Sequence, residues 1–575
     1  MINISKPIRT RLGAGPALLL GVVLLSGCRS PEEDDTGEEP KGNFDPNHMV
    51  QVDIQMDEDD WETLRNQYRN FTTELVGADC MSEPFSADYT TFSADVVIDG
   101  ESAKNVGIRK KGFIGSQSKE KPGLKINVDE WEEGAELFGV DNITLNNSVQ
   151  DPSLIKQCIG YDLFAKAGLP ASQCNFAHVT VNGKDMGVYV HVEPVKPAFL
   201  RKHFDNDDGD LYEGTLSDFH PLKVLTFDSK TPETDASLAP IKALSDALDK
   251  RDDPLLDILE QHINLDQYYS FWAMETLIGH WDGYNGDNTN NFYVYRDPVT
   301  ERFNFIPWGI DGTLYPEMFE DDDEEGFSLV PTGSVLSSAI LRSNTLYEPY
   351  YTRLQELLDE VWDEDAIIAE VDRMEVLVGT VIDGSEIATE IESIRKWVRG
   401  LRDAISAINH EKPDKASNPG CMTEIGSLDA SFETEWESFP NTSLHEISSV
   451  GDGEMEVTWD GYDVPFSEVG AATGEEENQW ATLVLSGLMD NGENTYIMPY
   501  FSFPIERAVP GASLPIDMTT LSAGLLYTGP DLGYVPVQAA WILGGSLDFE
   551  EFEPTAGGVI RGTVSTKIHT WQELE

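Results

Sequence analysis

The sequence predicts an α+β protein followed by a separate all-β domain. Between about residues 47 and 412, short alternating segments typical of strands give way to long stretches with helical periodicity. After Lys412-Pro413 the helical pattern stops, and short alternating runs separated by Gly, Pro and Asn continue to the end of the chain. We therefore expect an α+β unit over 47–412 and a β-sandwich or barrel over 425–575 that acts as an accessory domain.

The first residues have the pattern of a cleavable export signal. Basic side chains precede an apolar stretch over 12–25, which is too short and too often interrupted by Gly and Pro to span a bilayer. The stretch ends in Leu25-Ser26-Gly27-Cys28, which resembles the lipobox tetrad whose cysteine is lipidated. We therefore expect residues 1–28 to form a lipoprotein signal peptide with its lipobox, and Cys28 to anchor the exported chain in a membrane. The alternative is an ordinary cleaved signal followed by a chance cysteine.

The next segment, residues 29–46, is rich in Pro, Gly and acidic residues. Such a composition cannot bury enough apolar surface to fold, so we expect a disordered tether. The residue after Cys28 is Arg29 rather than Asp, which by analogy with enteric lipoproteins favours the outer membrane or the cell surface. The chain is expected to be an exported, membrane-anchored lipoprotein.

The first half of the α+β unit, about residues 47–215, is rich in expected strands. Asn182-Gly183 is a typical two-residue hairpin turn between two of them. One helix is expected over about 153–167, and Asp57 can cap another that runs to Tyr68. The expected strands are 50–54, 93–98, 124–128, 176–181 and 187–192.

The second half, about residues 216–412, is rich in expected helices. Apolar residues recur there at helical spacing, which predicts helices with one buried face. The expected helices are 255–278, 351–361, 366–378 and 386–408.

The charge of the chain limits its partners. There are 39 basic and 103 acidic residues, which give a formal net charge of −64. A surface this acidic repels nucleic acid, so we expect no nucleic-acid partner.

Four cysteines follow Cys28, and an even number in an oxidising compartment permits two disulfides. Their spacings match no zinc site, and Cys158–Cys174 is the more local pairing.

One segment of this acidic chain concentrates positive charge. Residues 109–125 hold six basic residues and one acid, and Gly112 and Gly115 let backbone amides approach a ligand closely. Such a segment suits a polyphosphate, although a solvated basic face that balances nearby acids is an equally good interpretation. The basic residues are Arg109, Lys110, Lys111, Lys119, Lys121 and Lys125.

A second segment, residues 280–314, predicts a β-hairpin with oxygen ligands at one end. Residues 292–296 and 302–308 alternate as strands, and Asp297-Pro298-Val299-Thr300 supplies the turn. In an antiparallel hairpin the start of one strand lies beside the end of the other, so Asn291 should lie near Asp311.

Asp282 lies in the loop that leads into this hairpin, which adds a second carboxylate. Carboxylate and amide oxygens suit Mg²⁺ or Mn²⁺ bound together with a phosphate. A turn-rich loop in which Asp and Asn cap backbone amides, or a structural calcium loop, would give the same pattern.

These segments carry motifs that resemble the CotH kinase family, which is named for spore coat protein H and comprises secreted, atypical relatives of protein kinases. The resemblance covers about residues 50–408. The matching elements are Lys111-Gly112, Leu124-Lys125-Ile126-Asn127, Leu137-Phe138-Gly139, Leu145-Asn146-Asn147, Asp151-Pro152-Ser153, Tyr161-Asp162-Leu163-Phe164, Val181-Asn182-Gly183, the run from Gly187 to Glu193, and the Trp-Asp, Asn-x-Tyr-x-Tyr and Pro-Trp-x-x-Asp elements of residues 280–314.

The resemblance implies an atypical two-lobed protein-kinase-like fold that binds ATP with Mg²⁺ or Mn²⁺ between an N-lobe of about 47–215 and a C-lobe of about 216–412. It implies that Asp282 is the catalytic aspartate. Asn291 and Asp311 correspond to the metal-binding amide and aspartate.

For ATP binding, the resemblance points to Lys125 as the strand lysine that contacts the phosphates, with Arg109 and Lys111 beside it. Glu193 ends the strand that leads to the hinge between the lobes.

Two positions depart from the family pattern. The family often has Trp-Asp-x-Asp where this chain has Trp308-Gly309-Ile310-Asp311, so only the second acid remains. The helix after Asp151 reads Ile155-Lys156-Gln157, where many members carry a Glu that could pair with the lysine.

The leading functional hypothesis is an ATP-dependent protein kinase that phosphorylates Ser or Thr of an unknown surface or envelope protein. The main alternative is a non-catalytic structural or adhesion lipoprotein that keeps a kinase-like scaffold. A third hypothesis is the transfer of AMP from the nucleotide, which the same residues could support.

Overall fold

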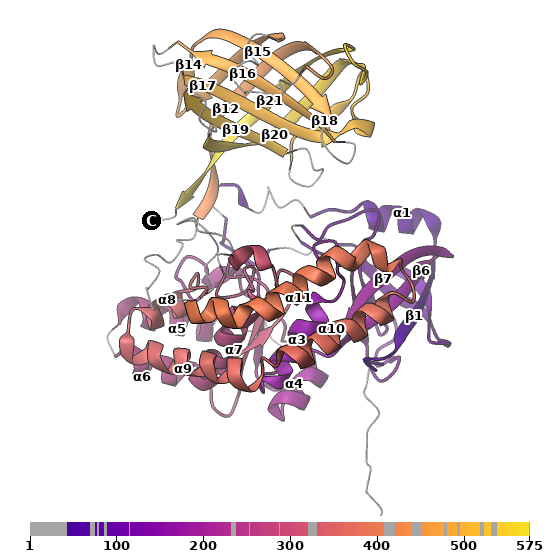
Figure 1. Cartoon of the computed structure of the whole chain (residues 1–575), viewed down its shortest axis with the longest axis vertical. Coiled ribbons are helices and arrows are strands. Elements are labelled where there is room, and N and C mark those ends of the chain that lie inside the picture. The colour runs from indigo at the N-terminus through magenta and orange to yellow at the C-terminus, as the bar shows by residue number, and fades with distance from the viewer. Residues whose placement is uncertain are drawn as a thin grey trace, which may run out of the picture. The chain divides into compact units, whose positions relative to one another are not determined.

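The computed structural model places most of the chain after residue 42 (Figure 1). The predicted signal peptide, Cys28 and most of the tether lie outside the described residues. The described residues are 43–69, 75–77, 80–85, 89–113, 115–231, 237–251, 254–286, 288–319, 330–407, 420–438, 450–475, 480–490, 495–517, 523–530 and 537–573.

The described residues form a mixed α/β structure that begins with a closed barrel. Its strand order is β1-β2-β3-β4-β5-β7-β6, and a parallel pairing of β1 with β6 closes the ring. The strands are β1 (Met49–Met56), β2 (Phe92–Ile98), β3 (Glu101–Lys111), β4 (Gly123–Asn127), β5 (Asn142–Asn146), β6 (Cys174–Val181) and β7 (Lys184–Val192).

The alternation of side chains along β3 gives the barrel wall two different faces. Val106 and Ile108 belong to the apolar interior, together with Leu124 and Ile126 of β4. Side chains one position out of phase with Val106 and Ile108 therefore point to the outer face. They include Arg109 and Lys111. Neither β3 nor β5 is predicted from the sequence, because apolar and polar residues do not alternate regularly along β3 and because β5 contains only two apolar residues.

The helix α3 (Lys156–Lys166) packs outside the barrel and is buried along most of its length. Its apolar residues share one core cluster with Val190 and Val192 on the outer face of β7. This packing joins the barrel to the helix-rich half of the chain. The shorter helices of this part are α1 (Glu58–Asn66), which Asp57 caps as expected, and α4 (Pro197–Phe204).

A second, four-stranded sheet has the order β11-β10-β8-β9. The antiparallel hairpin predicted for 292–308 is confirmed, and Asp297 stabilises its turn by accepting backbone hydrogen bonds from Val299 and Thr300. The strands are β8 (Asp210–Gly214), β9 (Asp228–Ser229), β10 (Phe292–Arg296) and β11 (Phe303–Pro307).

Helices pack against this sheet, and three of the long ones, α9, α10 and α11, are visible in Figure 1. The single helix predicted for 255–278 is wrong in one respect, because Ile263 is extended and forms a bridge with Phe303. That bridge divides the segment into α6 and α7. Within the described ranges, no helix is long and apolar enough to cross a membrane. The helices are α5 (Ala239–Lys250), α6 (Leu255–His262), α7 (Leu265–Ile278), α8 (Val335–Leu341), α9 (Asn344–Glu360), α10 (Glu364–Val378) and α11 (Gly384–Ala407).

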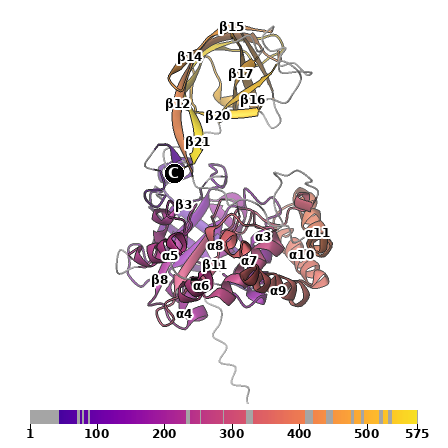
Figure 2. The same cartoon turned by 90° about the vertical axis from the view of Figure 1, so that its left-hand side faces the viewer.

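The described residues of the C-terminal part form mainly strands, as the sequence predicts, together with one short 3-10 helix, η5 (Ile505–Arg507). One sheet of ten strands has the order β14-β13-β12-β21-β20-β19-β17-β16-β15, with β18 paired to β20. The sheet curls so that β15 lies against β12 and β13 around its own apolar core (Figure 2). The strands are β12 (Gly420–Glu435), β13 (Asp452–Trp459), β14 (Tyr462–Val464), β15 (Phe466–Glu475), β16 (Trp480–Met489), β17 (Thr495–Pro504), β18 (Ser513–Pro515), β19 (Ala523–Pro530), β20 (Val537–Phe552) and β21 (Val559–Glu573).

The four cysteines after Cys28 form two disulfides. Cys158 on α3 is bonded to Cys174 at the start of β6, as the short spacing suggested. Cys80 is bonded to Cys421 at the start of β12, and this bond closes a loop of 341 residues. Both bonds agree with an oxidising compartment.

Removing the Cys158–Cys174 bond should destabilise the barrel and α3. A disulfide that closes a loop of 16 residues contributes about 3 kcal/mol by restricting the unfolded chain. We expect the Cys158→Ser/Cys174→Ser double variant to lose about 2–4 kcal/mol in the free energy of unfolding, measured by denaturant titration of tryptophan fluorescence. A loss below about 0.5 kcal/mol would show that the bond adds no constraint beyond the packing of α3.

Candidate functional site

The β10–β11 hairpin brings Asn291 next to the loop that follows β11. The Trp308 amide donates a hydrogen bond to the Asn291 carbonyl at 3.2 Å. Asn291 has φ +55°, and Gly309 opposite it has φ +52°. A Cβ atom at residue 309 would lie 2.5 Å from Asn291 Oδ1. Glycine at 309 therefore leaves room for the side-chain oxygen of Asn291, which any larger side chain would crowd.

The Asp282 carboxylate is held by three asparagine amides. Asn288 Nδ2 donates to Oδ1 at 2.9 Å, while the amides of Asn290 and Asn291 donate to Oδ2 at 3.3 and 2.8 Å. Burial raises the pKa of Asp282, and the three amide donors oppose that rise. Because Asn291 donates through Nδ2, its Oδ1 remains available as an acceptor or metal ligand.

A fully buried carboxylate fixes the loop that carries Asp282. Glu275 of α7 accepts hydrogen bonds from the amides of Tyr284 and Asn285 at 2.9 and 3.1 Å. It also accepts one from Asn285 Nδ2 at 2.7 Å. These bonds tie the loop to the rigid helix, so Asp282 projects from a supported turn.

Asp311 lies close to Asp282, on a loop that packs tightly against α3. A Cβ atom at Gly160 of α3 would lie 2.5 Å from Ile310 Cδ1, and one at Gly312 would lie 3.6 Å from Asp282 Cβ. Glycine at 160 therefore permits the close approach of Ile310 to α3, and Gly312 lies at ordinary van der Waals distance from Asp282. Burial raises the pKa of Asp311 to about 6, with the negative charges of Asp151 and Asp282 adding to the rise and Lys111 opposing it.

Lys111, at the end of β3, reaches this acidic region. Its ammonium nitrogen donates to Asn146 Oδ1 and lies 5.9 Å from the centre of the Trp308 ring. Burial lowers the pKa of Lys111 to about 8, against the attraction of Asp311. Lys111 is therefore the basic residue of the segment 109–125 that faces Asp311.

Lys125 and Arg109 lie side by side, because they are register partners on β4 and β3. Burial and the neighbouring cations lower the pKa of Lys125 to about 7. Among the described residues, the ammonium of Lys125 has no hydrogen-bond or ion-pair partner, although Glu213 of β8 attracts it. Glu213 itself pairs with Lys230 at 2.7 Å. An unpartnered, half-buried cation is suited to binding an anion.

Glu193 lies outside this group of residues. Its Oε2 accepts a hydrogen bond from the Gln173 amide at 2.9 Å and pairs with Lys202 of α4 at 3.2 Å. The structure thus brings Asp282, Asn291 and Asp311 together and places Lys111 beside them, with Glu193 engaged in a local network of its own.

Several residues that build the site carry little or no signal in the sequence. Asn288 and Asn290 belong to a loop rich in Asn and are not distinguished within it. Asp151 caps α3 by accepting a hydrogen bond from the Lys156 amide at 3.0 Å, and it is fully buried. Lys156 is also buried, and its ammonium lies 3.4 Å from the centre of the Tyr315 ring. The Asp-Pro-Ser motif marks the start of this helix, but neither spacing nor composition indicates that these charges lie near Asp311.

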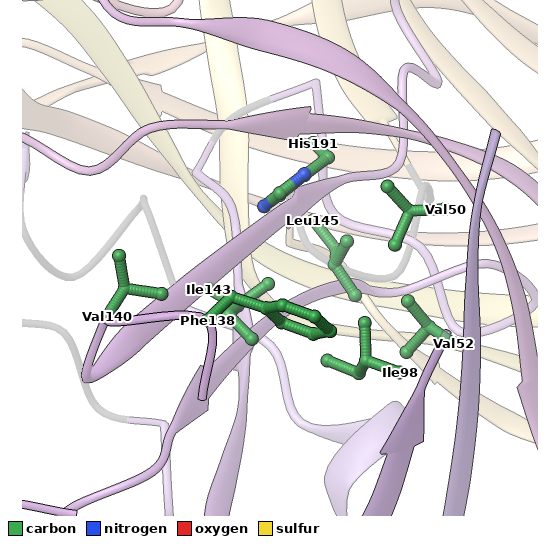
Figure 3. Close-up of a pocket in the computed structure, with 8 residues that line it drawn as sticks. All are labelled: Val50, Val52, Ile98, Phe138, Val140, Ile143, Leu145 and His191. Carbon is green, nitrogen blue, oxygen red and sulfur yellow. The ribbon is translucent and has the colours of Figure 1, made fainter. Parts of the chain in front are cut away.

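A small apolar cavity lies inside the barrel, away from these charged residues. Figure 3 shows its lining side chains, which come from several strands. The cavity of about 10 Å³ has room for about one water molecule, and its lining offers only His191 as a polar group. The lining residues are Val50, Val52, Ile98, Phe138, Val140, Ile143, Leu145 and His191. It is therefore too small and too apolar for a nucleotide.

The described part of the chain holds no group of three His, Cys, Asp or Glu side chains able to bind a metal ion by themselves. Asp311 and the free Oδ1 of Asn291 nevertheless suit Mg²⁺, which commonly takes one or two carboxylates and completes its shell with phosphate and water. The donor set fits a metal that arrives with a polyphosphate.

Comparisons with known proteins agree on a family. A family model described as CotH kinase protein matches residues 108–405. The inner spore coat protein H of Bacillus subtilis is 24% identical over 237 residues, which cover 39% of this chain and 64% of that protein. The invasin CotH7 of Rhizopus delemar is 21% identical over 243 residues, 39% of this chain and 40% of that one. The chain therefore spans less than two-thirds of the length of either relative.

One solved structure is also similar, a Helicobacter pylori proinflammatory kinase, CtkA. It is 10% identical and covers 49% of this chain and 90% of its own, with a TM-score of 0.28.

Asp311 should make stability depend on pH. Its pKa of about 6 lies above the ordinary value of 3.8, so the folded state holds this proton more tightly than the unfolded state. The free energy of unfolding therefore falls as pH rises from about 4 to 6. Above that range the buried negative charge of Asp311 lowers it by at most about 3 kcal/mol. Without metal, we expect Asp311→Asn to melt above the wild type at pH 7.5 and alike at pH 4.

Asp162→Asn, which removes a surface acid paired with Lys166 on α3, is the matched control and should show no such crossover. If Asp311→Asn melts below the wild type at pH 7.5, the carboxylate makes stabilising contacts that outweigh its burial.

Proposed function

Since the chain belongs to the CotH kinase protein family, we propose that it is an atypical protein kinase that transfers the γ-phosphoryl group of ATP to Ser or Thr hydroxyls of a surface or envelope protein. The observation that carries this proposal is the meeting of Asp282, Asn291 and Asp311 with Lys111. Phosphoryl transfer demands mainly positioning and charge neutralisation, and these four residues offer both.

In this proposal Asp282 is the general base. The asparagine amides hold one rotamer of its carboxylate, and a carboxylate has enough lone pairs to accept a substrate hydroxyl as well. Its raised pKa brings it nearer to neutral pH, which suits proton transfer from an attacking hydroxyl.

The cationic side chains Lys111, Lys125 and Arg109 would receive the phosphates of ATP. All three lie on the outer face of β3 and β4, and the surplus of positive charge there is unusual in a chain of net charge −64. Asp311 and Asn291 would hold Mg²⁺ or Mn²⁺, which neutralises phosphate charge when bound. On this proposal the barrel is the N-lobe and the helix-rich part the C-lobe of a kinase-like fold.

A second candidate is a non-catalytic surface protein on the same scaffold. The names of the relatives, a spore coat protein and an invasin, favour it, and the additional β-rich domain fits it as well.

The roles of Asp282 and Asp311 can be separated by measuring turnover and binding on the same preparations. Asp282→Ala should lower autophosphorylation by at least about 100-fold, because it removes the base, and should leave ATP affinity within about threefold. Asp311→Ala should lose turnover together with metal-dependent ATP binding, and Asn291→Ala should show a milder form of that loss.

Mass spectrometry of the wild type after incubation with ATP and Mn²⁺ or Mg²⁺ identifies the reaction. A gain of phosphate supports the kinase, a gain of AMP shows nucleotidyl transfer instead, and no gain together with no nucleotide binding supports the non-catalytic candidate. Thermal melts of each variant control for misfolding.

For the membrane anchor we propose lipidation of Cys28. Cys28→Ala should abolish the incorporation of labelled fatty acid and release the chain from the membrane fraction, because several acyl chains are needed for stable anchoring. Cys80→Ser is the control, since it removes a cysteine of the folded part by breaking the Cys80–Cys421 disulfide and should leave lipidation intact. Normal labelling of the Cys28→Ala variant would contradict the lipoprotein assignment.

A further inference from the structure

Two buried amides, rather than a carboxylate, hold Lys111 from the side of the helix α3. The Lys111 ammonium donates to Asn146 Oδ1 on β5, and Asn146 Nδ2 donates to Gln157 Oε1 on α3 at 2.7 Å. Asn146 is 9% exposed and Gln157 is 2% exposed, so water cannot replace either bond easily. These two hydrogen bonds link a barrel strand, the lysine and the helix through neutral groups.

The helix that carries Gln157 is held in place by several independent contacts. The next residue, Cys158, is bonded covalently to Cys174 of β6. Asp151 caps the start of the helix, and the absent side chain of Gly160 lets Ile310 pack against it. The disulfide and the packing of α3 on Val190 and Val192 hold the helix against the barrel, while Ile310 packs against it from the loop after β11.

We propose that Asn146 and Gln157 are positioning residues that hold Lys111 toward the ATP phosphates in a permanently assembled site. This inference rests on the proposed kinase function. In typical protein kinases a helix glutamate pairs with the lysine, and movement of that helix switches activity. Here the disulfide keeps the helix against the barrel. The hydrogen-bonded chain from Lys111 through Asn146 to Gln157, which we call the amide relay, replaces the ion pair.

The neutral relay also decides which charge balances Lys111. A glutamate at residue 157 would bury a carboxylate that could not touch the ammonium directly, because Asn146 lies between them. Glutamine satisfies Asn146 without adding that charge. The full positive charge of Lys111 then remains available to Asp311 and to a bound phosphate.

Substitutions at residue 157 separate geometry from charge. Gln157→Leu removes the acceptor of Asn146, so Lys111 loses its orientation, whereas Gln157→Glu keeps the acceptor and adds a negative charge. With the full mature chain, we expect Gln157→Leu to raise KM for ATP about tenfold and to change kcat by less than about threefold. Asn142→Ala, a change at another buried position of β5, is the matched control and should leave KM near the wild-type value.

A second measurement needs neither nucleotide nor activity. Labelling of Lys111 by a neutral amine reagent is followed against pH by peptide mass spectrometry, with the more exposed Lys119 as the internal reference. The Gln157→Glu variant should shift the midpoint of Lys111 labelling upward by about one pH unit, because a nearby carboxylate stabilises the ammonium. The midpoint of Lys119 should not move.

Unchanged Lys111 labelling in both Gln157 variants, with KM also unchanged, would overturn the relay even if the wild type is an active kinase. Conversely, if the wild type shows no ATP turnover, Gln157→Glu can still shift the midpoint of Lys111 labelling as expected. That result would uphold the relay and refute the proposed function. Parallel thermal melts identify a variant that has lost its fold. If Gln157→Leu does not fold, the labelling and KM of Gln157→Glu alone test the relay.

Discussion

Burying charged groups is costly unless other charges or hydrogen bonds compensate them, and the region around Asp311 buries several at once. Asp282 is compensated by asparagine amides, Glu275 of α7 by amides of the loop that carries Asp282, and Lys111 by Asn146 and the attraction of Asp311. The charged groups and the groups that compensate them come from different elements, namely the loop before β10, the helix α7 and the barrel strands β3 and β5. The loop, hairpin and helix must therefore assemble together, and the local folds of all three depend on this balance of charge.

Local patterns in the sequence are enough to predict several parts of the site. The hairpin over 292–308 is predictable because its strands alternate and its turn contains Asp-Pro, and the pairing of its ends then places Asn291 near Asp311. The Asn-Gly turn between β6 and β7 and the helix after Asp151-Pro152-Ser153 are predictable in the same way. Such features depend on neighbouring residues, so no long-range information is needed.

Long-range contacts account for the features that the sequence could not predict. The family motif favours Lys125 as the phosphate lysine, but only the tertiary fold brings Lys111 within electrostatic range of Asp311, and the β3–β4 register puts Lys125 beside Arg109. The break between α6 and α7 depends on a bridge between Ile263 and Phe303. Glu275 cannot be distinguished by pattern from any other acidic residue of a helix, because its burial depends on distant segments. These placements are properties of the assembled chain rather than of any segment.

The two departures from the family pattern have local structural counterparts. Gly309 lies where any side chain would press on Asn291 Oδ1, and Gln157, in the run Ile155-Lys156-Gln157 where the resemblance leads us to expect an acid, is separated from Lys111 by Asn146. Both changes remove a negative charge from a region that already contains Asp151, Asp282 and Asp311. Fewer acids there lower the mutual repulsion that the fold must overcome.

The bond between Cys80 and Cys421 changes the covalent topology of the molecule. Because it links cysteines 341 positions apart in the sequence, a protease that cuts the backbone once at any point between them opens a ring instead of separating two fragments. The C-terminal β-domain would stay attached to the barrel side of the chain until the disulfide was reduced as well. For any cut between the two cysteines, two independent chemical events, hydrolysis and reduction, are therefore required to release that domain.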